Sequence, residues 1–157
     1  MRVAIGTDHA GYALKERLRG ELEAWGHDVQ DLGTHSSEPV DYPDFCFPVG
    51  ERVARGEADR GIVLGGSGIG ESIAANKVGG VRASLVTSEE TARLSRRHND
   101  ANVLALGART NPDHDAVVRW VAVWLETPFE GGRHVPRIQK IRDYERAHAR
   151  DAEAGRV

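Results

Sequence analysis

The feature that most constrains the fold is a regular alternation between short apolar runs and longer segments with helical periodicity. The short runs are rich in Val and Ile, and they predict β-strands at residues 2–6, 28–32, 60–65, 81–86 and 102–107. The longer segments predict helices at residues 11–25, 43–56, 70–78, 88–98 and 112–126. Because each right-handed crossover returns its helix onto the sheet, we expect an α/β chain with a doubly wound, five-stranded parallel sheet.

A sixth helix is predicted after the fifth repeat, and no strand follows it. The helix opens near Pro136, a residue suited to the first turn, and carries Ile138, Ile141 and Tyr144 at helical spacing. Such a helix either lies across the body of the domain or reaches onto another subunit. We expect one domain over residues 1–149, followed by a small polar tail at 150–157 that frays.

Composition narrows the classes of partner. The formal net charge of -3 gives no reason to expect a nucleic-acid or membrane partner. No run of eighteen apolar residues occurs, and the apolar run near the start is cut off at Gly6, too short for a signal-peptide core. Cys46 is the only cysteine and lies among apolar residues, where a thiol packs as a small hydrophobe. We therefore expect a reducing, cytoplasmic setting and a small-molecule or protein partner.

The stretch GIVLGGSGIGESIAANK, residues 61–77, contains the main candidate for a binding site. Its glycines follow a predicted strand, at the sheet edge where parallel α/β sheets bind ligands, and precede a predicted helix. The backbone amides around Gly66, Gly68 and Gly70, with the positive end of the helix dipole, then form a cradle for an anion. The spacing matches neither the dinucleotide fingerprint nor the P-loop. The structural alternative is a tight turn whose glycines only permit close packing.

Glu71 stands where the glycines end and the helix begins. A helix dipole stabilises an exposed first-turn carboxylate by about 0.3–1 kcal/mol, so Glu71 has a purely structural explanation. A carboxylate beside inward-facing amides is also the arrangement that removes a proton from carbon next to a carbonyl, because the amides receive the oxyanion that forms. We expect the field of the amides to favour the ionised form of Glu71.

Polar residues also follow the first predicted strand, in the stretch GTDHAG. Asp8 has a structural explanation, because as an N-cap it accepts a hydrogen bond from the amide of Ala10 or Gly11. The structural explanation for His9 is weaker. The carboxyl ends of parallel strands share one edge of the sheet. Asp8, His9 and Glu71 should therefore face one cleft if the first and third strands are neighbours.

Further candidates occur near the fifth predicted strand and after it. His98 and Asn99 end a predicted helix, where a cationic side chain suits the dipole and Asn commonly terminates the turn. Arg109 follows the fifth strand, and Arg133 and Arg137 are four residues apart, which fits either a solvated face or a phosphate site at a helix start.

His98 and Asn99 also pose a geometric problem, because they precede the fifth strand. Within one subunit they should lie at the amino edge of the sheet, opposite the cleft. If they act in catalysis, they act on the cleft of a neighbour. The functional interpretation therefore requires a dimer with composite sites.

Five stretches of the sequence together resemble the RpiB/LacAB family of sugar-phosphate isomerases: GTDHAGYALK, DYPDF, GIVLGGSGIGESIAANK, ARLSRRHNDANVLALGAR and RHVPRIQKIRDYE. The resemblance covers nearly all of residues 1–146. It implies a Rossmann-like or flavodoxin-like three-layer fold, a homodimer or tetramer, and no metal or other cofactor. The implied activity interconverts D-ribose 5-phosphate and D-ribulose 5-phosphate through an enediolate, in the non-oxidative branch of the pentose phosphate pathway.

The resemblance also implies a role for each candidate residue. Glu71 is the base that moves a proton between C2 and C1 of the sugar, and Ser67 with the amides of the glycine turn holds the developing negative charge. His98, with Asp8, assists opening of the furanose ring, and Asn99 positions the sugar. The phosphate end of the site is lined by His9, Arg109, Arg133 and Arg137.

One departure from the family pattern concerns the base. One branch of the family uses a cysteine at the position that Gly65 occupies here, whereas Cys46 lies elsewhere in the chain. The implied base is therefore Glu71, as in the glutamate branch, and Cys46 is structural. No H-E-x-x-H motif or Cys/His ligand set occurs in the sequence, and isomerisation by proton transfer needs no metal.

Two alternatives to this function stay open from the sequence. The chain could act on another sugar phosphate, such as a tetrose, allose or galactose phosphate, because one sequence does not measure the pocket walls that set substrate length. It could also be a non-catalytic, flavodoxin-like nucleotide-binding module. The absence of a dinucleotide fingerprint argues against the module, in which the histidines, arginines and carboxylates would share no task.

Overall fold

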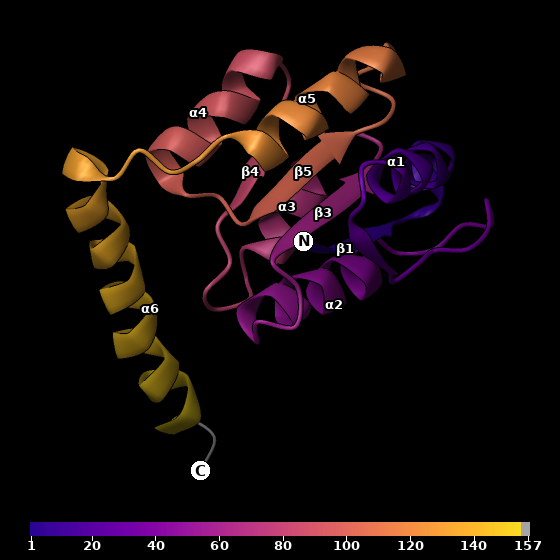
Figure 1. Ribbon diagram of the computed structural model, residues 1–157. Coiled ribbons are helices and arrows are strands. Elements are labelled where there is room, and N and C mark those ends of the chain that lie inside the picture. Colours follow the sequence, from indigo (N-terminus) through magenta and orange to yellow (C-terminus); the bar gives the residue numbers. More distant parts are fainter. Residues whose placement is uncertain (155–157) are drawn as a thin grey trace.

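The computed structural model describes residues 1–154, with side chains through Ala149, and shows strands and helices in alternation (Figure 1). The strands are β1 (Arg2–Thr7), β2 (Asp28–Asp31), β3 (Arg60–Gly65), β4 (Ala83–Leu85) and β5 (Val103–Gly107). The α-helices are α1 (Tyr12–Ala24), α2 (Pro43–Ala54), α3 (Ile69–Ala75), α4 (Glu89–Asn99), α5 (His114–Glu126) and α6 (Val135–Ala154). Short 3-10 turns, η1 (His9–Gly11) and η2 (Gly132–His134), precede α1 and α6.

The five strands form one parallel sheet in the order β2-β1-β3-β5-β4, which confirms the predicted α/β class. The chain runs from β3 to the edge strand β4 and then returns, so that β5 lies between them. Relative to the flavodoxin-like order, β4 and β5 exchange places. For the site, the important pairing is that of β1 with β3, in which Thr7 is in register with Leu64.

Most elements agree with their predicted ranges to within two residues at each end, and the two largest differences concern α3 and β4. The helix predicted at residues 70–78 ends at Ala75, where Asn76 forms the C-cap. The Asn76 side chain pairs with the backbone of Ala83, donating to its oxygen at 2.9 Å and accepting from its nitrogen at 2.8 Å. These bonds connect the end of α3 to the start of β4. The strand predicted at residues 81–86 is confined to Ala83–Leu85, because it is an edge strand that pairs only with β5.

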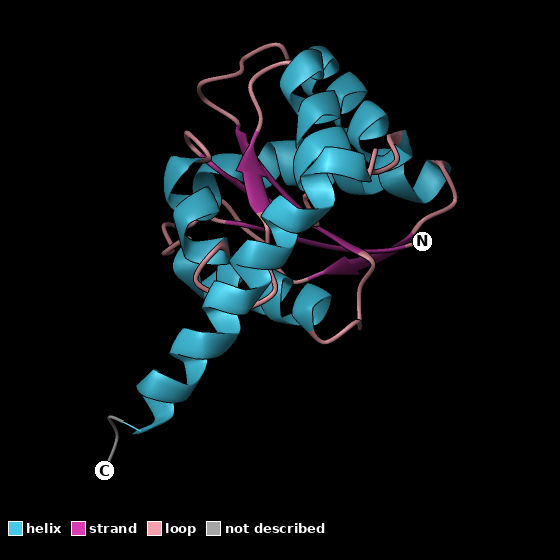
Figure 2. Ribbon diagram, turned by 90° about the vertical axis from the view of Figure 1, so that its left-hand side faces the viewer, coloured by secondary structure: helices cyan, strands magenta, loops and turns pink. Residues whose placement is uncertain are grey.

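Alternate side chains of the strands enter two hydrophobic cores, one on each face of the sheet. One core packs β-strand residues such as Ile5, Leu64 and Leu104 against α1, α4 and α5. The other packs smaller residues such as Ala4 and Ala105 against α2 and α3, and Cys46 lies fully buried in it. The result is the expected three-layer arrangement, with the sheet between two layers of helices (Figures 1 and 2). The prediction that Cys46 packs inside is confirmed.

The sixth predicted helix is confirmed as α6, which extends away from the three layers near the tails of the strand arrows (Figure 1). Ile138 is buried, but Ile141 is 47% exposed and Tyr144 is 66% exposed. A cavity of about 660 Å³ separates α6 from the loops that contain Arg82 and Asn102.

Residues 155–157, the end of the tail that we expected to fray, lie outside the described residues. Within residues 1–154, no helix has both the length and the apolar character that crossing a bilayer would require.

A buried ion pair connects α1 to the end of β2. Lys15 is fully buried, and its Nζ lies 2.6 Å from Oδ2 of Asp31 and 2.9 Å from Oε1 of Glu16. Oδ1 of Asp31 also accepts a hydrogen bond of 3.0 Å from the amide of Gly33. Gly33 in turn accepts from the amide of Thr7, the last residue of β1. The ion pair therefore stabilises the segment after β2, which is hydrogen-bonded to the end of β1 next to the candidate site.

We predict that Asp31→Ala lowers the free energy of unfolding by about 3 kcal/mol, because it leaves a buried ammonium with Glu16 alone. The control is Asp115→Ala, which removes the surface partner of Arg17 and should cost no more than about 1 kcal/mol. Urea denaturation of both variants measures the difference. Equal losses in the two variants would contradict a structural role for the buried pair.

Candidate active site

The strand order brings two of the predicted polar loops together. The chain leaves β1 for β2 on one side and comes back to β3 on the other, so the winding direction reverses between β1 and β3. Ligands of open α/β sheets bind at the carboxyl ends of the strands at such a reversal. Asp8 and His9 follow β1 there, and the turn from Gly66 to Gly70 follows β3. The prediction that these residues share one edge of the sheet is confirmed.

The glycine turn places Glu71 inside the protein. Gly68 is the N-cap of α3 and has a φ of 78°, a left-handed conformation that favours glycine, and Glu71 lies in the first turn of the helix. The side chain turns back under β3 and is only 3% exposed. A Cβ atom at Gly65 would overlap the Glu71 carboxylate. Gly65 is therefore required because the carboxylate occupies the space of its missing side chain.

Burial raises the pKa of Glu71 above its ordinary value of 4.5, and the negative charge of Asp8 raises it further. The backbone amides of Glu71 itself and of Gly68 act in the opposite direction, because they stabilise the ionised form. We expected the amides to dominate, and this expectation is wrong in sign. Desolvation is the largest effect, since the carboxyl group lies under the sheet rather than on an exposed helix end. A raised pKa makes the carboxylate a stronger base.

The loop after β1 holds its two polar residues by backbone contacts. Oδ1 of Asp8 accepts a hydrogen bond of 2.9 Å from the amide of Ala10, which confirms the N-cap interpretation. Asp8 is 8% exposed, and its charge acts on Glu71, so capping does not exclude a second role. Nδ1 of His9 lies 3.2 Å from both the nitrogen and the oxygen of Val40. This contact fixes the imidazole ring at the carboxyl edge.

The remaining groups at this edge are hydrogen-bond donors. The amides of Gly66 and Ser67 donate to no other group within the described part of the chain. Oγ of Ser67 accepts from the amide of Ile69 at 3.2 Å, which leaves its own hydroxyl proton to donate elsewhere. The amide of Arg109 donates to the Gly66 oxygen at 2.9 Å, which places this exposed residue beside the turn. The edge can thus supply a base, several donors and a cation to one ligand.

The other predicted residues lie at the opposite edge of the sheet. α4 runs back toward the amino ends of the strands, so His98 and Asn99 are at the edge where β4 and β5 begin, as the geometric argument predicted. The His98 ring stacks on His134 in η2, with ring centroids 4.4 Å apart. Arg133 and Arg137 are exposed beside this pair, and burial and neighbouring positive charges lower the pKa of His134. The predicted residues therefore form two separate groups within one chain.

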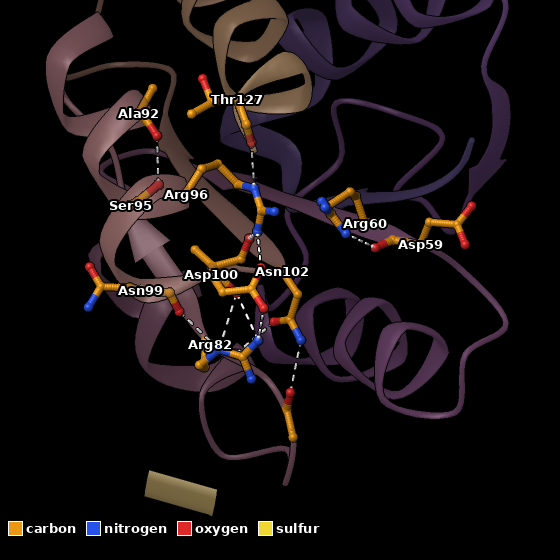
Figure 3. Close-up of polar contacts among 12 residues, drawn as sticks. Asp59, Arg60, Arg82, Ala92, Ser95, Arg96, Asn99, Asp100, Asn102 and Thr127 are labelled. Carbon is orange, nitrogen blue, oxygen red and sulfur yellow. Dashed lines mark hydrogen bonds and ion pairs between the residues drawn. The ribbon is translucent and has the colours of Figure 1, made fainter. Parts of the chain in front are cut away.

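A polar network fixes the end of α4 at this second edge (Figure 3). Arg96 is 3% exposed and donates to the Asp100 carboxylate at 2.8 Å and to the Ala101 oxygen at 2.6 Å. Arg82 donates to the other oxygen of the Asp100 carboxylate at 3.2 Å and to the backbone oxygen of Asn99 at 3.1 Å. The left-handed residue that ends the helix is Asp100, with a φ of 46°, and not Asn99 as the sequence suggested. The network sets the position of the preceding His98.

Sequence reasoning missed several residues of this arrangement. Tyr42 lies within the motif DYPDF, and its ring lies against Gly70, where a Cβ atom would meet it at 2.6 Å. No pattern in the sequence indicates a role for Glu130 or His134, and the structure brings both to His98. Donor atoms of these three side chains lie within 4.8 Å of one another, which makes them the candidate metal-binding group among the described residues. Because Glu130 and His134 are distant from His98 in the sequence, no local sequence pattern predicts that these side chains meet.

The fold and the carboxyl-edge site define a class of α/β protein that combines a buried carboxyl group with free backbone donors at one edge of a parallel sheet. Comparison with known proteins identifies one family within that class. The sequence matches the family described as Ribose/Galactose Isomerase over residues 3–141, and the chain belongs to this family. The resemblance identified from the sequence motifs is thereby confirmed.

Individual relatives cover almost the whole chain. Ribose-5-phosphate isomerase B from Escherichia coli (strain K12) is 44% identical over 140 residues, which cover 89% of this chain and 93% of the relative. Ribose-5-phosphate isomerase B from Clostridium thermocellum has a TM-score of 0.92 and 50% identity, covering 94% of this chain and 99% of that one. The Mycoplasma genitalium enzyme with bound ribulose-5-phosphate has a TM-score of 0.89 and 42% identity, covering 92% and 96%.

The raised pKa of Glu71 predicts a specific dependence of stability on pH. Between pH 4.5 and the raised pKa, the folded chain keeps a proton that the unfolded chain has released, so the free energy of unfolding falls as pH rises. Glu71→Gln removes this titration. The free energy of unfolding of the variant should therefore increase relative to that of the native chain across this window and then stay constant. Denaturation series at several pH values measure the change, and a relative decrease would contradict the assigned burial.

Proposed function

We propose that this chain is an aldose-ketose isomerase that interconverts D-ribose 5-phosphate and D-ribulose 5-phosphate by proton transfer. The observation that carries the proposal is the buried Glu71 carboxylate of raised pKa beside the free amides of Gly66 and Ser67. Family membership and the ribose-5-phosphate isomerase B relatives support the same reaction. Neither alternative, another sugar phosphate or a non-catalytic nucleotide-binding module, is favoured by a particular feature of the site.

The reaction moves one proton and one electron pair between neighbouring carbons. Glu71 removes the proton from C2 of the open aldose, and the electron pair passes through the new C1–C2 double bond to O1. The oxygen atoms exchange a proton, Glu71 returns its proton to C1, and O2 becomes the carbonyl oxygen. Because the base ends in its starting state, the cycle needs no external oxidant or reductant. A base whose pKa is raised toward the working pH accepts a carbon-bound proton more readily than an ordinary glutamate.

The glycine turn stabilises the enediolate. Negative charge develops on the sugar oxygens, and the amides of Gly66 and Ser67, the Ser67 hydroxyl and the first-turn amide of Gly70 are the available donors. The amide of Gly68 instead acts on the Glu71 carboxylate. Donors fixed on a short turn between strand and helix require little reorganisation during the reaction, which is the condition for effective oxyanion stabilisation. His9 and Arg109 bind the phosphate at the same edge.

Ring opening requires the second half-site. We assign it to His98, acting with Asp8, while Asn99 positions the sugar and Arg133 and Arg137 bind the phosphate. Asp8 and His98 lie at opposite edges of the sheet in one chain, so the pair forms only when a second copy presents its amino edge. The proposed assembly is therefore a homodimer, or a tetramer built from two such dimers, in which each active site uses residues of two chains. The exposed Ile141 and Tyr144 of α6 provide apolar surface for this contact.

The isomerase proposal is tested with ribose 5-phosphate in deuterated water, in the presence of a chelator. We expect ribulose 5-phosphate that carries deuterium at C1, because a proton held by Glu71 exchanges with solvent between the two transfers. A panel of four-, five- and six-carbon sugar phosphates tests the substrate. No ketose product, or a six-carbon sugar turned over far better than ribose 5-phosphate, would overturn the proposed function.

We predict that Glu71→Gln lowers kcat by about 10²- to 10⁴-fold, the range for loss of a general base. Gly65→Ala should cause a comparable loss, although the carboxylate remains, because the new Cβ displaces it. The matched control is Gly20→Ala, where a Cβ meets nothing within 4 Å. Steady-state assays and a folding check on each variant measure these effects. Full turnover by Gly65→Ala would show that the observed carboxylate position is not the reactive one.

Mixing two inactive variants tests the composite site. Glu71→Gln and His98→Ala damage opposite half-sites, so a mixed dimer contains one doubly damaged site and one native site. Random exchange of subunits makes about half the dimers mixed, and activity should recover to about a quarter of the native value. Half-sites that act within one chain would give no recovery. Denaturing and refolding the mixture, followed by the isomerase assay, measures the outcome.

A further inference from the structure

A second cluster of ligand-type side chains lies outside the carboxyl-edge site, around the end of α4 and η2. It consists of His98, Glu130 and His134, whose donor atoms all lie within 4.8 Å of one another. Nε2 of His98 is 3.8 Å from Oε2 of Glu130, and the two imidazole rings are stacked with an angle of 17° between their planes. Two imidazoles and one carboxylate are a donor set that first-row transition metals bind.

The strongest sign that this cluster can take a ligand is His134. It is 4% exposed, and its Nε2 is buried without a hydrogen-bond partner in the described part of the chain. A buried polar atom without a partner is unfavourable, and most such atoms in proteins are paired. Glu130 has spare capacity too, because Arg97 contacts only its Oε2 at 3.0 Å. A cation bound here would satisfy His134 without displacing Arg97.

We propose that His98, Glu130 and His134 form an inhibitory site for Zn²⁺ or a similar borderline transition metal. The inhibitory role rests on the proposed function, in which His98 acts in opening the sugar ring. A nitrogen lone pair that binds a metal is unavailable for proton transfer. The metal is a regulator or inhibitor in this proposal and supplies no chemistry to the isomerisation itself.

Geometry indicates how the site would close. Ligand distances for Zn²⁺ are about 2.0–2.2 Å for nitrogen and oxygen, so the donor atoms must approach one another further. Stacked rings direct their lone pairs along nearly parallel planes, and one ring must therefore turn about its Cβ–Cγ bond. The His98 side chain is 32% exposed and is the ring with room to turn, whereas His134 is held in the interior. Three protein ligands leave a fourth position open to water.

The charges around the cluster limit its affinity for a dication, and its donor atoms determine which metals it selects. Arg97, Arg133 and Arg137 lie nearby and oppose a dication, so we expect weaker binding than at a structural zinc site of four ligands. Hard cations such as Mg²⁺ prefer oxygen donors in an octahedral arrangement, which two imidazoles do not provide. The site should therefore discriminate strongly between Zn²⁺ and Mg²⁺.

Calorimetric titration of the full chain, stripped of metal, with Zn²⁺ alone tests the site. We expect one Zn²⁺ per chain, no competition by Mg²⁺, and a Kd raised at least about tenfold by Glu130→Gln or by His134→Ala, since even loss of an outer-shell partner has an effect of that size. Glu130 is exposed, so its variant should fold if the buried His134 variant does not. The matched controls Glu126→Gln and His148→Ala, both at exposed positions outside the cluster, should leave Kd unchanged.

The isomerase assay then tests the consequence. Zn²⁺ should inhibit the native chain, EDTA should reverse the inhibition, and the inhibitory concentration should rise in Glu130→Gln in parallel with its Kd. Absence of Zn²⁺ binding, or binding that neither substitution weakens, overturns the site even if the chain is an active isomerase. Binding without inhibition of an active chain overturns the inhibitory role. If the chain has no isomerase activity, the proposed function fails separately, because calorimetry measures the site directly.

Discussion

The position of the Glu71 carboxylate, in the space where Gly65 lacks a side chain, is the contact on which the site depends. It brings the carboxyl group under the sheet, where burial raises its pKa, and it holds the first turn of α3 against the end of β3. A buried carboxyl group lowers stability when ionised, so the chain gives up folding free energy at neutral pH to keep this group, the proposed base, in the interior. Part of the glycine turn stabilises this contact directly, because the amide of Gly68 acts on the Glu71 carboxylate.

The direction of the strands explains why the polar residues form two groups. Loops after β1, β3 and β5 lie at the carboxyl edge, whereas the end of α4 and the turn before α6 lie at the amino edge. A parallel sheet with helical crossovers cannot bring both edges to one cleft within a single copy. Hydrogen bonds from Arg96 and Arg82 nevertheless order the end of α4, next to His98. In the proposed homodimer, a second copy would bring its own His98 to the Glu71 of the first copy.

Most of the fold could be predicted, because hydrophobic periodicity is a local property of the chain. The strands, the helices, the parallel sheet and the buried Cys46 all follow from residue spacing and composition. The ends of α3 and β4 could not be predicted, since they depend on the Asn76 side chain meeting Ala83 across a gap in the sequence. The exchange of β4 and β5 in the sheet has the same origin, because local periodicity carries no information about which strands become neighbours.

The sequence by itself determined the residue types of the site: a glycine turn that ends in Glu71, polar residues after β1, and a cationic end to α4. The tertiary structure decided which of them meet and in what environment. It reversed the expected direction of the Glu71 pKa, because desolvation depends on everything packed around a side chain and not on its neighbours in the helix. It also assembled Glu130 and His134 around His98, a contact between segments about thirty residues apart that no local pattern encodes.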